Sequence, residues 1–248
     1  MDNYFEKEFD LRYYEMDTIA QATPVTILTL LQETAADHCL YAGYSLFQLM
    51  DKNLGWVLLS GAMQMERYPT YKEKITIRTW ISTYHSIRGI RENIIYDEEK
   101  NIIGRAKGLW LFYDIERRRP TRILDDFKQA WSSDKMQSLT CDITSKLQSI
   151  KITTHAKEFK VNLYDTDTNK HVNNIRYLQW LMESVPEEIL KNYYLYRIDG
   201  RFIGEAKYGD VVVSSIKQDD NKYTFSHAVH VKGDNQLCAL AQTVWKKR

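Results

Sequence analysis

Cysteine is scarce in this chain, and its copies lie far apart. The 248 residues include only Cys39, Cys141 and Cys238, which show neither the paired pattern of a disulfide framework nor the close spacing of a zinc site. So few cysteines are typical of a reducing, intracellular compartment. We therefore expect no disulfide and no bound metal, and no motif indicates another cofactor.

The chain also lacks a long apolar run and a marked net charge. No stretch has the length and apolarity of a membrane span, and residues 1–6 lack the character of a secretory signal. The formal net charge of +1 is unlike that of a general nucleic-acid binder. These absences predict a cytoplasmic protein with no membrane span and no nucleic-acid partner.

The apolar residues that are present suffice for two small fused domains. Hydrophobic residues make up 44% of the chain and aromatic residues 12%, which can supply a substantial core at this length. Residues 131–153 are largely polar and show no strong periodicity, so we interpret them as a linker. The expected domains are residues 1–130 and 154–248.

A sequence repeat supports this division. Residues 14–24 and 164–174 lie 150 positions apart and align Asp17 with Asp167. A stripe of mostly apolar residues at helical spacing follows each copy. They are Val25, Leu28, Leu31, Ala35 and His38 in the first half, and Ile175, Leu178, Leu181, Met182 and Val185 in the second. Duplication of one structural unit explains the pattern.

Each copy of the repeat also carries signals for the start of a helix. Thr23 is a suitable cap and Pro24 suits the first helical turn. In the second copy Asn173 or Asn174 can cap the helix, which is expected to end before Pro186. The polar residues of both copies are thus predicted to lie at the N-terminus of a helix.

The two copies differ in chemistry. If the second copy is extended, Asp167, Asn169 and His171 alternate along the chain and share one face. The first copy has Ile19 and Gln21 at the positions of Asn169 and His171. We therefore place catalysis in the second half, beside helix N–H groups that can hold a developing negative charge. The same residues could instead form a capping network.

Strand signals follow each predicted helix, with polar turns between them. The expected strands are Trp56–Met65, Glu73–Ile81, Ile87–Tyr96 and Ile102–Tyr113 in the first half, and Arg201–Glu205, Asp210–Lys217, Tyr223–Val231 and Leu237–Trp245 in the second. A long helix whose apolar stripe must be covered by an antiparallel sheet indicates a hotdog unit. The predicted fold is therefore α+β, a tandem or double hotdog.

The chain resembles the acyl-ACP thioesterase family, in its shorter bacterial form, over nearly its whole length. Residues 165–177 are similar to the family's signature at the start of the second hotdog helix, and residues 116–120 and 202–210 are similar to two weaker family segments. The resemblance implies hydrolysis of the thioester between a fatty acyl chain and the phosphopantetheine arm of acyl carrier protein, which ends or diverts fatty acid synthesis.

Four residues match the family's catalytic positions: Asp167, Asn169, His171 and Glu205. Many members have a cysteine after that glutamate, whereas this chain has Ala206. If the enzyme is active, its chemistry must use carboxylates, imidazole and water. The roles we expect are activation of water by Glu205, general base or nucleophile for Asp167, and orientation and polarisation by Asn169 and His171. Backbone N–H groups at the helix start would bind the thioester oxygen.

The first half is expected to house the acyl chain. Its candidate lining residues, which could equally be core, are Leu28, Leu31, Trp56 and Met63. The run Arg117, Arg118 and Arg119 could dock the acidic carrier or could be a solvated or structural turn. A homodimer is compatible with this reading. Two alternatives to the acyl-ACP hydrolase stay open: a thioesterase for acyl-CoA or a related thioester, and a non-catalytic acyl-binding module.

Overall fold

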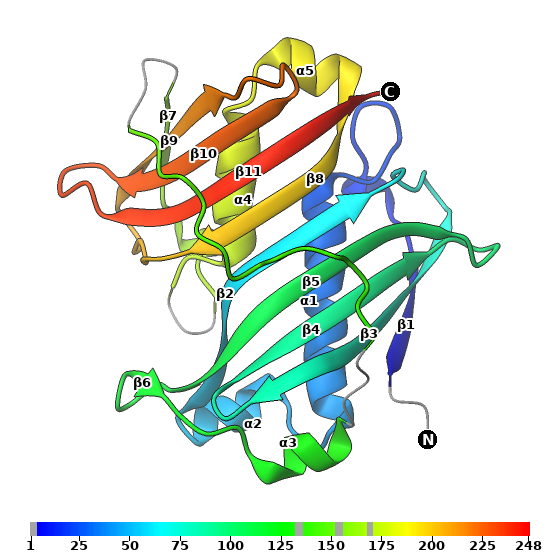
Figure 1. Cartoon of the computed structure of the whole chain (residues 1–248), viewed down its shortest axis with the longest axis vertical. Helices are drawn as coiled ribbons and strands as arrows, with labels where there is room; N and C mark the ends of the chain where they lie inside the picture. Colours follow the sequence, from blue (N-terminus) through cyan, green and yellow to red (C-terminus); the bar gives the residue numbers. More distant parts are fainter. Residues whose placement is uncertain (1–3, 132–135, 152–155, 168–170) are drawn as a thin grey trace. The chain divides into compact units, whose positions relative to one another are not determined.

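The computed structural model describes residues 4–131, 136–151, 156–167 and 171–248. The chain divides into two compact units, Met1–Ile143 and Thr144–Arg248. Each unit contains one antiparallel sheet and one principal helix (Figure 1). This is the repeated helix-and-sheet arrangement that the sequence predicted.

The first unit has its five long strands in the order β1-β3-β4-β5-β2. Their bounds, with those of the short strand β6 that pairs with β5, are β1 Phe5–Asp10, β2 Leu54–Met65, β3 Lys74–His85, β4 Arg88–Tyr96, β5 Ile102–Asp114 and β6 Arg119–Pro120. Its helices are η1 Tyr13–Glu15, α1 Pro24–Tyr41, α2 Leu46–Asp51 and α3 Asp125–Ala130. The four strands expected in this half are confirmed, with small differences at their ends.

The second unit repeats this order of elements along the chain. Its sheet has the strand order β8-β11-β10-β9-β7. The strands are β7 Lys157–Lys160, β8 Tyr193–Phe202, β9 Val211–Gln218, β10 Thr224–Val231 and β11 Leu237–Lys247. The helices are η2 Leu163–Asp165, α4 Asn174–Glu183 and α5 Glu187–Asn192.

Helix α1 begins as predicted but buries a slightly different face. Thr23 caps it, because its Oγ1 accepts the N–H of Thr26 at 3.0 Å, and Pro24 occupies the first turn. The predicted stripe included Leu28 and Leu31, which are only half-buried. The buried residues of the helix are Thr26, Ile27, Leu30, Thr34, Ala35, His38 and Cys39. The buried face of the helix is therefore shifted around the helix axis from the predicted one. It includes two threonines, which the apolar pattern of the sequence does not identify.

Helix α4 also begins where the sequence predicted. The side chain of Asn173 caps it by accepting the N–H of Ile175 at 2.9 Å. The helix ends at Glu183, shortly before Pro186, as expected. Its buried residues, Tyr177, Leu178, Trp180, Leu181 and Met182, pack against β9, β10 and β11. Trp180 stacks on Phe159 of β7 with the ring centroids 6.0 Å apart.

Besides the two-residue strand β6, three strands were not predicted or were predicted with wrong bounds. β1 and β7 were missed because they are short edge strands with alternating charges, FEKEFD and KEFK, which lack the apolar content of a central strand. The third case is β8. It begins at Tyr193 and ends at Phe202, whereas the expected strand was Arg201–Glu205.

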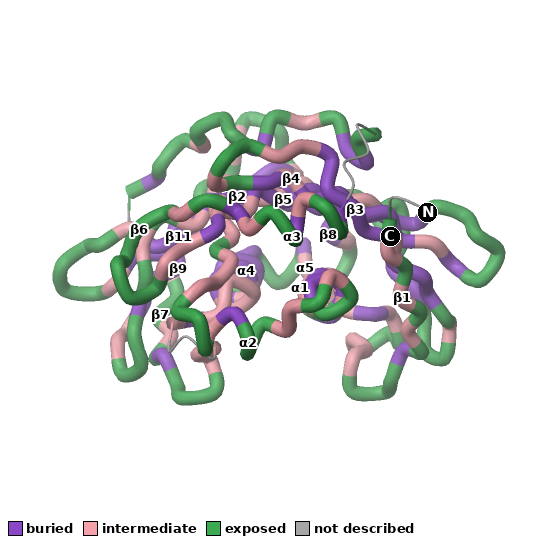
Figure 2. Tube along the Cα trace, turned by 90° about the horizontal axis from the view of Figure 1, so that it is seen from below, coloured by how far each residue is buried: buried purple, intermediate pink, exposed green. Residues whose placement is uncertain are grey.

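Buried residues run along the strands and helices, and the exposed ones gather in the loops (Figure 2). An aromatic cluster forms part of the first unit's core: Cys39, Leu49, Ile81, Phe112, Ile123, Phe127 and Trp131, with Trp56 and Tyr84 packed against it. None of the described helices is both long and apolar enough to cross a membrane.

The segment expected to link the domains packs on both sheets. Ser138 donates its Oγ hydrogen to Glu92 of β4 at 2.6 Å, and Leu139 and Ile143 are buried in the first unit. Ser145 accepts the Nε–H of Arg201 through its carbonyl at 2.9 Å in the second unit. The described part of this segment is therefore held against a sheet on either side of the boundary between the units.

Candidate active site

Hydrogen bonds between Asp167 and His171 join the two ends of the segment that we call the Asp167 turn. The N–H of Asp167 donates to the carbonyl of His171 at 2.8 Å, and the N–H of His171 donates to Asp167 Oδ1 at 3.3 Å. A β-bridge between Thr166 and Val172 continues this pairing on the side of α4. Asp167 and His171 are thus held together at the start of the helix, whereas Asn169 lies outside the described residues.

The Glu205 loop, residues 203–210, follows β8. The expectation that Glu205 belongs to a strand is wrong, because the N–H groups of Ile203 and Gly204 both donate to the carbonyl of Cys238, at 2.8 and 3.1 Å, and so break the regular ladder. A Cβ on Gly204 would lie 2.6 Å from the carbonyl oxygen of Leu237. Only glycine allows this close approach.

Tyr177 of α4 fixes the Glu205 loop and was given no role by the sequence analysis. Its hydroxyl oxygen accepts the N–H of Ala206 at 2.8 Å. Tyr177 is 2% exposed and Ala206 is fully buried, and burial raises the pKa of the tyrosine. The loop and the helix are therefore joined at the residue next to Glu205. The only signal in the sequence was the position of Tyr177 within the helix signature.

The Asp167 turn and the Glu205 loop bring two reactive side chains into contact. Nε2 of His171 lies 3.2 Å from Oε2 of Glu205, and the two side chains are 43% and 52% exposed. A carboxylate within hydrogen-bond reach of an imidazole can hold the ring in place and accept or relay a proton. Because both side chains are partly exposed, a substrate can reach them.

Asp167 makes a hydrogen bond that is also found in the first unit. There Asp17 donates its N–H to the carbonyl of Gln21 at 2.7 Å, and its Oδ1 accepts the N–H groups of Ile19 and Gln21, both at 3.0 Å. The carboxylate that closes the turn is therefore common to both copies. What distinguishes the second copy among the described residues is His171, in the place of Gln21, and the glutamate that His171 contacts.

The first unit contains a counterpart of the Glu205 loop, the Tyr68 loop of residues 66–73. Glu73 accepts the N–H of Leu11 through its carbonyl at 3.4 Å, just as Asp210 accepts that of Val161 at 2.8 Å. Lys72 and Gly209 precede these acids with φ of 71° and 91°. The alignment of the two loops places Tyr68 opposite Glu205.

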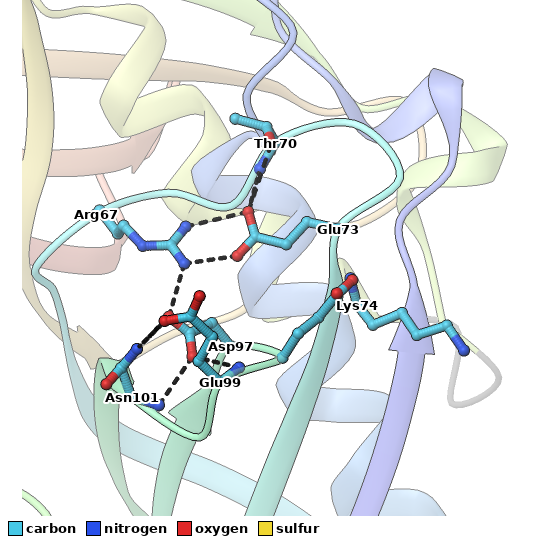
Figure 3. Close-up of polar contacts among 8 residues, drawn as sticks. Arg67, Thr70, Glu73, Lys74, Asp97, Glu99 and Asn101 are labelled. Atoms are coloured by element: carbon cyan, nitrogen blue, oxygen red, sulfur yellow. Dashed lines mark hydrogen bonds and ion pairs between the residues drawn. The ribbon is translucent and has the colours of Figure 1, made fainter.

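Ion pairs brace the Tyr68 loop in the first unit (Figure 3). Arg67 binds both carboxylate oxygens of Glu73, at 2.6 and 3.1 Å, and donates to Asp97 at 2.9 Å. Glu73 also accepts the N–H of Thr70 at 3.0 Å. Tyr68 itself is 5% exposed. This copy of the loop thus presents a buried tyrosine and a closed ionic network, whereas the second copy presents an exposed glutamate.

The candidate lining residues of the first half have different environments. Met63 is 2% exposed in the core of the unit. Leu28 and Leu31 are half-buried on α1, and Trp56 is half-buried against the aromatic cluster. All four lie in the first unit.

The arginine run lies in an exposed turn after β5. The N–H of Arg117 donates to Asp114 Oδ1 at 2.8 Å, Arg118 has a φ of 51°, and Arg119 pairs with Asp114 in the short strand β6. All three arginines are exposed. The backbone of this turn therefore braces the end of the sheet, while the side chains stay accessible to a partner.

Two of the three cysteines have thiols that burial makes inert. Burial raises the pKa of the thiols of Cys39 and Cys238 to about 11, so both are protonated at neutral pH. Cys141 belongs to the first unit. Among the described residues no group of three His, Cys, Asp or Glu side chains is arranged to hold a metal ion.

Some N–H groups at the N-terminus of α4 are already engaged in hydrogen bonds. Asn173 accepts two first-turn N–H groups: its side chain takes that of Ile175 at 2.9 Å, and its carbonyl takes that of Arg176 at 2.8 Å. A thioester oxygen would therefore have to be bound by a donor at or before Asn174.

Two family models match the chain, one in each half. The model described as the acyl-ACP thioesterase N-terminal domain matches residues 2–131, and the model described as the acyl-ACP thioesterase C-terminal domain matches residues 148–247. Together they cover most of the sequence, including the Asp167 turn and the Glu205 loop.

Curated relatives and solved structures agree with this match. An oleoyl-acyl carrier protein thioesterase of Arabidopsis thaliana chloroplasts is 26% identical over 98% of this chain and 76% of its own length. The structure of an acyl-ACP thioesterase from Bacteroides thetaiotaomicron superposes with a TM-score of 0.86 at 20% identity, covering 98% of both chains. That of a 12:0-ACP thioesterase from Umbellularia californica gives 0.87 at 21% identity, covering 100% of this chain and 99% of the other. The double hotdog fold is confirmed.

Proposed function

Because the chain belongs to the acyl-ACP thioesterase family, we propose that it hydrolyses fatty acyl-ACP thioesters to free fatty acid and holo-ACP, which ends or diverts fatty acid synthesis. The observation that carries the proposal is the contact of 3.2 Å between His171 and Glu205. This pair occurs only in the second half of the chain. In the first half, Gln21 and Tyr68 occupy the corresponding positions.

The proposed reaction uses this pair to activate water. Glu205 accepts a proton from a water molecule as its oxygen attacks the thioester carbonyl carbon. His171, held by Glu205 and by the Asp167 turn, polarises the reacting groups and relays the proton that Glu205 accepted to the departing sulfur of the phosphopantetheine arm. The C–S bond breaks, and the products are a carboxylic acid and a free thiol. No cysteine takes part, in keeping with Ala206 beside Glu205.

Asp167 and Asn169 complete the proposed catalytic set. Asp167 serves as general base or as transient nucleophile, in addition to closing its turn. Asn169 orients the substrate, as its match to the family signature implies. The thioester oxygen is stabilised by N–H groups at the start of α4, from Asn174 or the residues just before it.

The two units have different roles in this proposal. The first unit houses the acyl chain, with Leu28, Leu31, Trp56 and Met63 as candidate lining residues, and the second unit carries out the reaction. Acyl carrier protein is the proposed partner, docked by the exposed side chains of the arginine run. A homodimer and a cytoplasmic location stay predictions.

Two other functions make different experimental predictions. The same residues could hydrolyse acyl-CoA or a related thioester, and a non-catalytic acyl-binding module would need none of them. Purified protein should be assayed against matched acyl-ACP and acyl-CoA substrates over a range of chain lengths. A higher kcat/KM for acyl-ACP supports the proposal. A preference for acyl-CoA would favour the second function, and binding without turnover of either substrate would favour the third.

A further inference from the structure

Arg91 of β4 is buried in the first unit, where the described residues that it contacts are neutral. Its side chain is 5% exposed. It donates to Nδ1 of His38 at 2.9 Å and to Oγ1 of Thr79 at 3.0 Å, and its guanidinium carbon lies 5.3 Å from the centre of a Trp131 ring. An arginine keeps its charge in proteins. The interior of this unit therefore holds a positive charge.

The ionisable neighbours of Arg91 do not balance that charge. Burial and the nearby guanidinium lower the pKa of His38 to about 2, so this histidine is neutral. Burial raises the pKa of the Cys39 thiol to about 11 and raises that of the Tyr84 hydroxyl as well. All three are uncharged at neutral pH.

The adjacent acid, Glu92, points away from Arg91. Successive residues of a strand face opposite sides of the sheet. Glu92 pairs with Lys107 at 3.3 Å and accepts hydrogen bonds from Ser82 and Ser138 at 2.9 and 2.6 Å. Within the described part of the chain no carboxylate forms an ion pair with Arg91.

Two further buried donors lie in the same cluster. Nε1 of Trp56 and the hydroxyl of Tyr84 are both buried, and neither finds a partner among the described residues. The ring of Trp56 is 6.0 Å from that of Trp131, which Arg91 contacts. Unsatisfied buried donors are rare in folded proteins, and each one calls for an explanation.

The apolar surroundings of these donors indicate what kind of ligand would supply an acceptor for them. The cluster around these donors consists of aromatic and aliphatic side chains, among them Phe112, Phe127 and Leu49. An uncompensated buried charge is costly unless an anion pairs with it. We propose that the Arg91 site, defined by Arg91, His38, Thr79, Tyr84, Trp56 and Trp131, binds the carboxylate end of an alkyl chain.

Two molecules can present this chemistry. One is an acyl thioester that bears a second carboxylate at its far end, and the other is a free fatty acid that enters with its carboxylate first. This inference rests on the proposed function, in which the first unit houses the acyl chain. Binding, however, can be measured without turnover.

The first experiment compares ligands that differ only in charge. Calorimetric titration of the protein at neutral pH should show decanoate binding about 10-fold or more tightly than decanol, the scale of a charge-assisted hydrogen bond. Arg91→Met should abolish that preference, and Arg91→Lys should keep part of it. Arg78→Met is the control, since Arg78 lies on the neighbouring strand β3 and pairs with Glu6 at 2.8 Å near the surface.

The proposal is overturned by either of two results. One is equal binding of decanoate and decanol to the parent protein. The other is a preference that survives in a folded Arg91→Met variant, because the carboxylate must then bind elsewhere. If Arg91→Met does not fold, the parent protein and the Arg91→Lys variant decide.

A second experiment separates the two sources and the underlying function. A medium-chain acyl thioester is assayed with and without a carboxylate at its far end. Faster turnover of the carboxylated substrate that is lost in Arg91→Met identifies the substrate as the ligand. Equal turnover with Arg91-dependent competitive inhibition by decanoate identifies the free fatty acid. If no thioester is hydrolysed but Arg91-dependent binding persists, the hydrolase proposal fails and the Arg91 site stands.

Discussion

The Asp17 turn, from Asp17 to Gln21, and the Asp167 turn are closed by the same hydrogen bonds but carry different side chains. In both turns the aspartate and the residue four positions later make the same pair of hydrogen bonds. The difference lies in Gln21 against His171, together with the loop residue that each turn faces. A duplicated scaffold can thus keep its hydrogen bonds in both copies while only one copy retains reactive side chains.

The largest expected effect tests this asymmetry directly. His171→Ala and Glu205→Gln should each lower kcat by about 100-fold or more, because they remove a group that acts on a proton in the transition state. Gln21→Ala and Tyr68→Phe are the matched changes in the first unit and should have little effect. Steady-state kinetics on folded variants, checked by circular dichroism, would reject the assignment if Gln21→Ala cost as much as His171→Ala.

A second comparison separates the two roles of Asp167. Asp167→Asn and Asp17→Asn both keep an oxygen that can accept the backbone N–H groups, and both remove a charge. We expect similar, small changes in Tm for the two variants. Only Asp167→Asn should lower kcat, by about 100-fold if the carboxylate is base or nucleophile. Equal, near-normal turnover in both would mean that Asp167 is structural, like its counterpart.

Tyr177 is expected to have an intermediate effect. Tyr177→Phe leaves the N–H of Ala206 without its acceptor, and an unsatisfied buried donor costs about 1–3 kcal/mol of stability. Because this residue positions Glu205, kcat should fall about 10-fold while KM changes little. Tyr193→Phe, which removes a hydroxyl bonded to that of Tyr223 at 3.0 Å in the same unit, is the control. If the two variants lose kcat equally, Tyr177 does not act through the Glu205 loop.

The smallest effect concerns the carrier. Charge reversal at Arg117, Arg118 and Arg119 should raise KM for acyl-ACP several-fold, because exposed charges mainly speed the encounter with an acidic partner. Turnover of a small acyl thioester should be unaffected. KM for acyl-ACP should rise with salt in the parent and much less in the variant, since such attraction is screened over about 8 Å at physiological salt. An equal loss on both substrates would favour the bracing role of this turn.

Local signals in the sequence were sufficient for the two principal helices and for most of the strands. Capping residues placed the starts of α1 and α4 correctly, since a side chain and the N–H it accepts lie within three positions of each other. Alternation of apolar residues located seven strands. The edge strands β1 and β7 could not be found this way, because their place depends on a neighbouring strand more than on their own apolar content.

The sequence alone determined that one unit is duplicated and that only the second copy keeps an acid, an amide and an imidazole together. These are properties of residue order. The tertiary structure decided that the Glu205 loop leaves the strand so that Glu205 meets His171, that Tyr177 holds this loop, and that Arg91 is buried with no countercharge among the described residues. These facts depend on contacts between residues far apart in the chain, and periodicity within a segment contains no information about its partners.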